Sequence, residues 1–454
     1  MKINKINKLL WVVVLMLCQS CSEFLDSKPN KNLVILNSLD DFQQLLDAEG
    51  SGMNNYLNLG LISSDDVYFG ESLLSRLSFS QQAYYLWEEE TYMPDAWDAG
   101  FAGAYEKVLY ANVVLDGLSD YSPANDLERA RMSELEASAR FYRAMGHFEV
   151  LMHFSEPFDP DQDDQLGVPI RLTSDINVKV GRSTMKESFS QIITDLESGV
   201  EQLPAKASIP TRPSRWAALA MLGRVYLTMQ DYTQAYDYSK EALEMGDELM
   251  DFKGLNSDLP YSFEVFNPEV IFYQRHLSSR FTTNGESFVN PDLVDLYDSS
   301  DLRREYFLLP SSSEGLYNFK GNYTGDFYHF GGIAVDEVLL NLAESAARTA
   351  KESEANAALR NLLENRMDEN FQLPDDLTGE VLLSKILMER RKELLFRGIR
   401  WIDLKRLNQE AESAETLERK YNELNPILAP EDTRYTFLIP PAEINLNPMP
   451  QNNR

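Results

Sequence analysis

Two segments of the chain combine aromatic side chains with carboxylate and amide groups. The first covers residues 65–92 and the second covers residues 317–328. Aromatic planes stack on the apolar C–H faces of sugar rings, and carboxylates and amides bond to sugar hydroxyls, so a carbohydrate site needs both types together. Burial in the core is the alternative for each aromatic. The expected contact residues are Asp66, Tyr68, Tyr85, Trp87, Tyr92, Tyr317, Asn322 and Tyr323.

An acidic loop over residues 159–164 offers a second type of chemistry. Asp159, Asp161 and Asp163 alternate along it, which is the spacing of the first ligands in a calcium loop. However, Asp164 stands where such a loop needs glycine, and Ile170 stands where it needs a bidentate glutamate. The calcium site is therefore a weak candidate beside a solvated acidic loop, and no metal or other cofactor is expected.

Signatures of catalysis are missing from the sequence. It contains no glycine-rich phosphate loop, no GxSxG and no HExxH, and His147 and His153 are six positions apart rather than the four that place two metal ligands on one helix face. A carboxylate pair for glycoside hydrolysis depends on spatial separation, and 72 acidic residues offer many pairs. We expect a binding protein rather than an enzyme, with a surface glycoside hydrolase as the alternative.

The first residues have the pattern of an export signal. Three lysines precede an apolar run over residues 9–17, and Ser20-Cys21 follows. The run is about half as long as the roughly 20 residues of a membrane-spanning helix, so we predict a signal peptide over residues 1–20. Ser20-Cys21 resembles the lipobox of bacterial lipoproteins, which makes Cys21 the expected lipidated residue. Cys18 is an alternative acceptor, and a plain secretory signal is the alternative to lipidation.

The composition restricts the possible partners. The net charge is −30, from 42 basic and 72 acidic residues, and such a field repels the phosphate backbone of nucleic acids. Nucleic acid is therefore not expected as a partner. No cysteine follows Cys21, so the core must stabilise the exported chain without disulfides.

Helical periodicity dominates the rest of the chain. Apolar residues recur at three- and four-residue spacing over 127–154, 185–202, 215–245, 335–367 and 382–396. Small and large residues alternate within 215–245 and 335–367, as they do in tetratricopeptide helix pairs. Residues 50–100 and 250–330 lack this periodicity and predict loops and short strands.

We therefore predict a mostly α fold in which tetratricopeptide-like helix pairs form a scaffold for a loop-rich ligand-binding region with short strands. The mature chain, residues 21–454, is expected to form one body. Its N-terminal part covers about 21–230 and its C-terminal part about 260–454.

Five motifs resemble, in order, those of the SusD/RagB family. They are Cys21–Asp26, Trp97–Leu115 with Tyr105 and Asn112, Ala139–Phe154 followed by Gly167–Ile170, Glu389–Arg406, and Ile439-Pro440 with Asn447–Asn452. We expect these motifs to be structural. In Glu389–Arg406, Gly398 suits a left-handed turn, Trp401 suits the core, and the arginines suit pairing with carboxylates rather than with ligand.

The resemblance implies a nutrient-binding lipoprotein on the outer membrane. Such a protein acts as a hinged lid on a SusC-like TonB-dependent transporter and passes an oligosaccharide inward, with a peptide as the alternative ligand. In this family, the ligand site is built from the two loop regions, brought together on the face away from the helix repeats.

Overall fold

A computed structural model describes residues 36–48, 52–372, 375–421 and 424–454. The predicted signal peptide, Cys21 and the motif that begins there lie outside these residues. Within the described residues, no helix is both long enough and apolar enough to cross a membrane.

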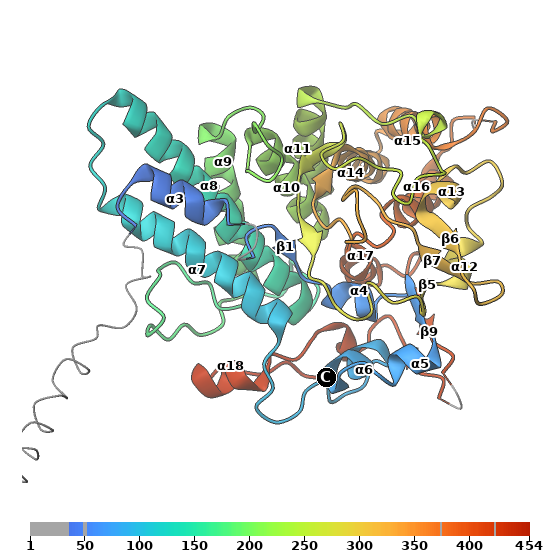
Figure 1. Cartoon of the computed structure of the whole chain (residues 1–454), viewed down its shortest axis with the longest axis horizontal. Helices are drawn as coiled ribbons and strands as arrows, with labels where there is room; N and C mark the ends of the chain where they lie inside the picture. The colour runs from blue at the N-terminus through green and yellow to red at the C-terminus, as the bar shows by residue number, and fades with distance from the viewer. Residues whose placement is uncertain (1–35, 49–51, 373–374, 422–423) are drawn as a thin grey trace, which may run out of the picture.

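Nine longer helices form the scaffold of the described chain (Figure 1). They are α7 (Ala99–Ser119), α8 (Asp126–Phe154), α9 (Met185–Gln202), α10 (Arg215–Thr228), α11 (Tyr232–Met245), α14 (Val335–Arg348), α15 (Glu352–Arg366), α16 (Gly379–Glu393) and α17 (Arg400–Leu407). Neighbouring helices pack from α7 and α8 through α9, α10 and α11 to α14 and α15, so the array crosses the molecule. The predicted mostly α fold is confirmed.

The helix pairs are close because small residues lie at their contacts. A Cβ atom at Gly223 of α10 would lie 2.6 Å from the Oγ of Ser239 on α11, so only glycine allows this approach. Beside it, Tyr226 and Tyr238 stack with ring centroids 5.4 Å apart. The pairing predicted for 215–245 is therefore confirmed as α10 and α11.

The helices predicted over 127–154, 185–202 and 335–367 are confirmed as α8, α9 and the α14–α15 pair. The last prediction, 382–396, differs, because α16 ends at Glu393. Phe396 and Gly398 have φ angles of +58° and +76°, in the left-handed region, and so turn the chain into α17. A Cβ at Gly398 would lie 2.7 Å from the Cε1 atom of His276.

Shorter elements cover the scaffold. The short helices are α3 (Leu39–Leu46), α4 (Leu59–Ser63), α5 (Glu71–Leu74), α6 (Phe79–Tyr85), α12 (Pro291–Val294), α13 (Arg303–Phe307) and α18 (Pro441–Leu446), with 3₁₀ turns at η2 (Phe252–Gly254) and η3 (Thr433–Tyr435). The strands are β1 (Asn55–Tyr56), β2 (Val67–Phe69), β3 (Val270–Phe272), β4 (Arg275–His276), β5 (Ser287–Val289), β6 (Leu308–Pro310), β7 (Tyr317–Phe319), β8 (Ile333–Ala334), β9 (Leu417–Glu418) and β10 (Ile427–Leu428).

Strand pairing joins the two aperiodic segments. β1 pairs in parallel with β4, and β2 pairs antiparallel with β5, which places Tyr68 opposite Phe288. The remaining pairs are β3 with β8, β6 with β7 and β9 with β10, all antiparallel. Residues 50–100 and 250–330 are therefore side by side in space.

The motif over Glu389–Arg406 is structural, as predicted. Trp401 is fully buried, its Nε1 donates to the carbonyl of Tyr435 at 3.2 Å, and its ring stacks on Phe437. The motif's arginines pair with carboxylates: Arg390 with Asp403, Arg391 and Arg400 with Asp65, Arg397 with Asp336, and Arg406 with Glu344.

Candidate functional site

Most of the residues predicted to contact ligand are buried. Only Tyr68 and Tyr317 are partly exposed. The other six side chains belong to the core, which corrects the expectation that they present a surface to ligand. These six are Asp66, Tyr85, Trp87, Tyr92, Asn322 and Tyr323.

Three of the buried aromatics, Tyr85, Trp87 and Tyr92, come from the first aperiodic segment, and Arg419 packs on two of them. The guanidinium of Arg419 lies 3.8 Å from the ring centroid of Tyr85 and 4.6 Å from that of Trp87. The Nε1 of Trp87 donates to the carbonyl of Ser63 at 2.9 Å, and the hydroxyl of Tyr92 contacts that of Tyr84. These contacts are internal. The aromatics therefore stabilise the turn between α6 and the following loop and do not contact a ligand.

Asp66, Asn322 and Tyr323 are also enclosed by the fold, and the last two form hydrogen bonds within it. The hydroxyl of Tyr323 lies between the carboxylates of Glu269 and Asp336, at 2.9 and 3.0 Å. Asn322 accepts a hydrogen bond from the backbone N–H of Phe330. Burial, reinforced by the neighbouring Asp65, raises the pKa of Asp66 to about 7.

Tyr68 and Tyr317 lie on β2 and β7, the two strands that flank β5. Each is partly covered, Tyr68 by Phe288 and Tyr317 by the guanidinium of Arg304. Neither lines the clefts described below.

The acidic loop does not gather its carboxylates around one point. Asp159 accepts from the backbone N–H of Asp161 and from the side chain of Gln162, while Asp163 pairs with Lys186. These contacts close a turn and form a surface ion pair. The loop therefore has the geometry expected of a solvated acidic loop rather than that of a calcium site.

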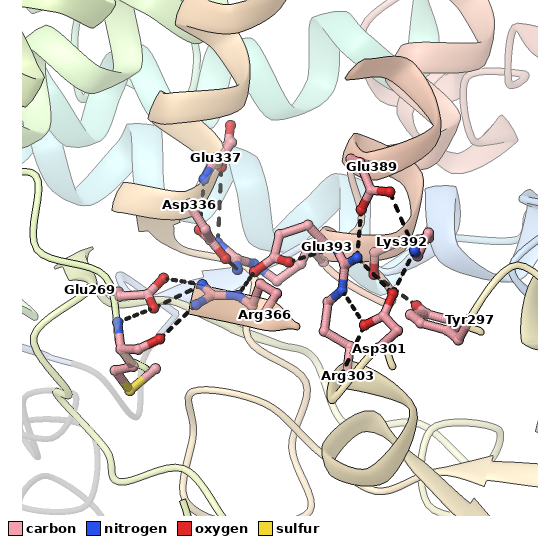
Figure 2. Close-up of polar contacts among 12 residues, drawn as sticks. Glu269, Tyr297, Asp301, Arg303, Asp336, Glu337, Arg366, Glu389, Lys392 and Glu393 are labelled. Atoms are coloured by element: carbon pink, nitrogen blue, oxygen red, sulfur yellow. Dashed lines mark hydrogen bonds and ion pairs between the residues drawn. The ribbon is translucent and has the colours of Figure 1, made fainter. Parts of the chain in front are cut away.

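The described chain contains one group of three carboxylates whose oxygens lie within 4.8 Å of one another, formed by Glu269, Asp336 and Glu393. Figure 2 shows that the side chain of Arg366 lies among these carboxylates. Arg366 bonds to both oxygens of Glu269 at 2.8 and 2.9 Å and to Glu393 at 2.7 Å. The oxygens that a metal would need are thus used by guanidinium groups, so the cluster holds the fold together.

The four histidines belong to the core. Burial lowers the pKa to about 3 for His147 and His276 and to about 4 for His153 and His329. The Nε2 of His147 accepts from the backbone N–H of Arg171 at 3.1 Å. The Nδ1 of His153 lies 2.7 Å from the carbonyl oxygen of Glu149, so both histidines that were weighed as metal ligands form hydrogen bonds to the backbone.

The described chain contains an open cleft of about 780 Å³, called here the large cleft. Its walls are the first half of α7, the segment 169–176, and the C-terminal residues 443–449. Residues 55–57 and Leu277 also line it. The family motifs build these walls, because Tyr105 donates to the carbonyl of Pro169 and Asn112 to that of Arg171. The predicted structural roles of Tyr105 and Asn112 are confirmed.

A second cleft of about 380 Å³, called here the small cleft, adjoins the large one. The two share Trp97, Ala99, Gly100 and Leu277. Hydroxyl, amide and carboxylate groups line the small cleft, from Ser78, Ser80, Gln81, Asp98, Ser278 and Ser279.

Trp97 stands where the two clefts meet, and its side chain is 67% exposed. Its position follows from the start of α7, where Asp98 caps the helix by accepting from the N–H of Phe101 at 2.9 Å. Gly100 allows Leu57 to pack closely against the start of α7, since a Cβ at Gly100 would lie 2.2 Å from Leu57. An exposed indole between two clefts that hold both apolar and polar side chains is a platform for the apolar face of a ring-shaped ligand.

Sequence reasoning assigned Trp97 only to the structural motif of α7. The available signal was its place just before the capping residue, in Asp95-Ala96-Trp97-Asp98-Ala99-Gly100, where acidic and small neighbours offer a large ring little cover.

The fold and these clefts define a class: a helical-pair scaffold protein with an open cleft between its loops and its C-terminal segment. The family model described as starch-binding associating with outer membrane matches residues 23–227, and the SusD family model matches residues 336–454. Together they match more than half of the chain. The protein belongs to the SusD/RagB family.

Solved structures share this fold over nearly the whole chain. A putative sugar binding protein from Bacteroides vulgatus is 23% identical with a TM-score of 0.75, covering 92% of this chain and 98% of that one. A SusD superfamily protein from Bacteroides thetaiotaomicron is 22% identical with a TM-score of 0.74, covering 92% and 100%. A Bacteroides fragilis member is 22% identical with a TM-score of 0.75, covering 91% and 99%. No curated protein matches this sequence significantly.

Proposed function

We propose that this protein captures an oligosaccharide at the cell surface without chemical change. The observation that carries the proposal is the exposed indole of Trp97 between two clefts that combine apolar and polar side chains. Stacking on an aromatic plane together with hydrogen bonds from the walls is how proteins hold sugar rings. The names of the family model and of the Bacteroides vulgatus neighbour, starch-binding and sugar binding, support the same ligand class.

The proposal extends to the setting in which capture takes place. Family membership and the outer-membrane description of the matched model support a lipid-anchored protein, attached through Cys21, that serves as a lid on a SusC-like TonB-dependent transporter. The mature chain would act as one body, since the buried ion pair between Arg224 of α10 and Glu337 of α14 joins its two parts. The ligand would bind reversibly in the clefts and pass inward.

Replacing the platform residue tests the binding site. We expect Trp97→Ala to weaken binding by about 1–3 kcal/mol, the range for truncating an aromatic anchor, because it removes the stacking surface. The ligand would be the strongest binder of a glycan and peptide array, and calorimetric titration would measure its affinity. A peptide as the strongest binder would replace the oligosaccharide in the proposal.

The matched control is Phe327→Ala. Phe327 is 49% exposed and lies outside both clefts, so this variant should bind with unchanged affinity. Equal binding by the Trp97→Ala and wild-type chains would place the ligand elsewhere.

The lipid anchor is tested separately in the native host. We expect Cys21→Ala to release the protein from the membrane fraction, because the acylated thiol is lost. Immunoblotting of membrane and released fractions would measure this, with Cys18→Ala as the control that stays membrane-bound. Retention of Cys21→Ala together with release of Cys18→Ala would transfer the anchor to Cys18.

A further inference from the structure

The large cleft contains two opposite charges that the fold leaves without partners. Arg171 lies on the 169–176 wall and Glu443 on α18, and both are partly buried. Among the described residues, no side-chain hydrogen bond and no ion pair within 4.0 Å reaches either group. By contrast, Arg391 and Arg400, which line another pocket, both pair with Asp65.

Hydrogen bonds fix the two segments that carry Arg171 and Glu443. The N–H of Arg171 donates to His147 at 3.1 Å and its carbonyl accepts from Asn112 at 3.0 Å. On the opposite wall, the N–H of Ala442 donates to the carbonyl of Ala96 at 3.1 Å, and Asn445 donates to Asp95 at 2.9 Å. The two groups therefore face a cleft of fixed shape instead of closing on each other.

The electrostatics agree with two unpartnered groups. Burial raises the pKa of Glu443, as it does for a carboxylate that receives no hydrogen bond, and the charge of Arg171 opposes this shift only in part. No ion pair within 4.0 Å joins the two groups among the described residues, and both side chains line the same cleft, so a ligand in the cleft can contact both.

The chemistry of the two groups selects the ligand. A guanidinium only donates hydrogen bonds and a carboxylate only accepts them, whereas a hydroxyl group does both. A pair of adjacent hydroxyls can accept from Arg171 and donate to Glu443 at once. A ligand carboxylate could pair with Arg171 but would be repelled by Glu443 and Glu106, and a ligand ammonium group could pair with Glu443 but would be repelled by Arg171. A charged group therefore satisfies only one of the two residues, whereas a hydroxyl pair satisfies both.

We propose that Arg171 and Glu443 together bind adjacent hydroxyl groups of a neutral sugar unit and exclude uronic acids and amino sugars. This inference rests on the proposed function, because it names the class of oligosaccharide for the same cleft. Trp97 would supply the apolar face of the site, and the charge pair would supply its selectivity.

Calorimetry with chemically matched probes tests this. The mature chain carrying Cys21→Ala would be titrated with maltoheptaose and cellohexaose as neutral probes, with an oligogalacturonate as the anionic probe, and with a chitosan hexamer as the cationic probe. We expect at least one neutral probe to bind at least about tenfold more tightly than either charged probe, since each charged probe meets a like charge in the cleft.

Variants of the two residues then test the pair itself. Arg171→Ala and Glu443→Gln should each weaken neutral binding about tenfold, the effect of losing a hydrogen bond to a charged group. The double variant should be little weaker than either single variant, because the hydroxyl pair needs both groups. Arg129→Ala, an exposed arginine on α8 far along the sequence from both walls, is the control and should bind as the wild type does.

The outcomes separate this inference from the proposed function. If Trp97→Ala loses binding while Arg171→Ala and Glu443→Gln do not, the charge pair is not part of the site and the inference alone is overturned. The inference is also overturned if the oligogalacturonate binds best and Glu443→Gln strengthens its binding. If none of the probes or array glycans binds the wild-type chain, both proposals are overturned.

Discussion

Arg303→Met should lower the free energy of unfolding by about 3–5 kcal/mol, the cost of removing one partner from a buried ion pair. Arg303 is fully buried on α13 and is the common partner of Asp301, Glu389 and Glu393, at 2.7, 2.5 and 3.0 Å (Figure 2). Without the guanidinium, these three carboxylates remain in the core with less positive charge to offset their negative charge. Lys392 still pairs with Asp301 and Glu389, Lys385 with Glu389, and Arg366 with Glu393.

Chemical denaturation followed by circular dichroism would measure this loss. Arg129→Met is the matched control, because Arg129 pairs with Asp126 on the surface and its side chain is 66% exposed. An exposed pair of this kind contributes at most about 1 kcal/mol. Equal stability of Arg303→Met and wild type would show that the buried network does not hold α13 against α16.

Trp401→Ala should lower the free energy of unfolding by about 3–5 kcal/mol, because it removes a large core side chain and leaves a cavity. The ring packs against Tyr435 and Phe437, with centroids 4.9 and 5.5 Å away. The variant also leaves the carbonyl of Tyr435 without the indole N–H. Differential scanning calorimetry would measure the loss as a lower Tm.

The contrast with Trp97 makes this prediction specific. Trp97→Ala should change the free energy of unfolding by less than about 0.5 kcal/mol, as exposed substitutions do, while weakening ligand binding. Trp87→Ala should behave like Trp401→Ala, because its ring is buried against Arg419. A stable Trp401→Ala protein that no longer binds ligand would overturn this division between scaffold and site.

Local sequence patterns were sufficient for the scaffold. The period of apolar residues predicted α8, α9 and the helix pairs, because each helix buries one continuous face and its pattern is complete within a few turns. Local capping residues also lie at helix boundaries. At the start of α9, for example, Thr184 and Glu187 form a reciprocal capping box. The structural roles predicted for Tyr105, Asn112 and Trp401 were also correct, since these residues bond to or pack against the fold.

The end of α16 shows where local reasoning failed. The apolar run continues through Phe396, and its pattern alone predicted a longer helix. Phe396 instead adopts a positive φ and packs on Phe319 of β7, a strand remote in sequence. A tertiary contact of this kind is not encoded in the spacing of nearby residues.

The sequence by itself determined the helical scaffold, the export pattern and the kind of side chains available for binding. Only the tertiary structure decided which of them face solvent. Trp87 and Tyr323 are buried because Arg419, Glu269 and Asp336 reach them from distant segments. Trp97, Arg171 and Glu443 share a cleft because the C-terminal segment folds back beside α7. Exposure depends on what the whole chain places against a side chain, and no local pattern carries that information.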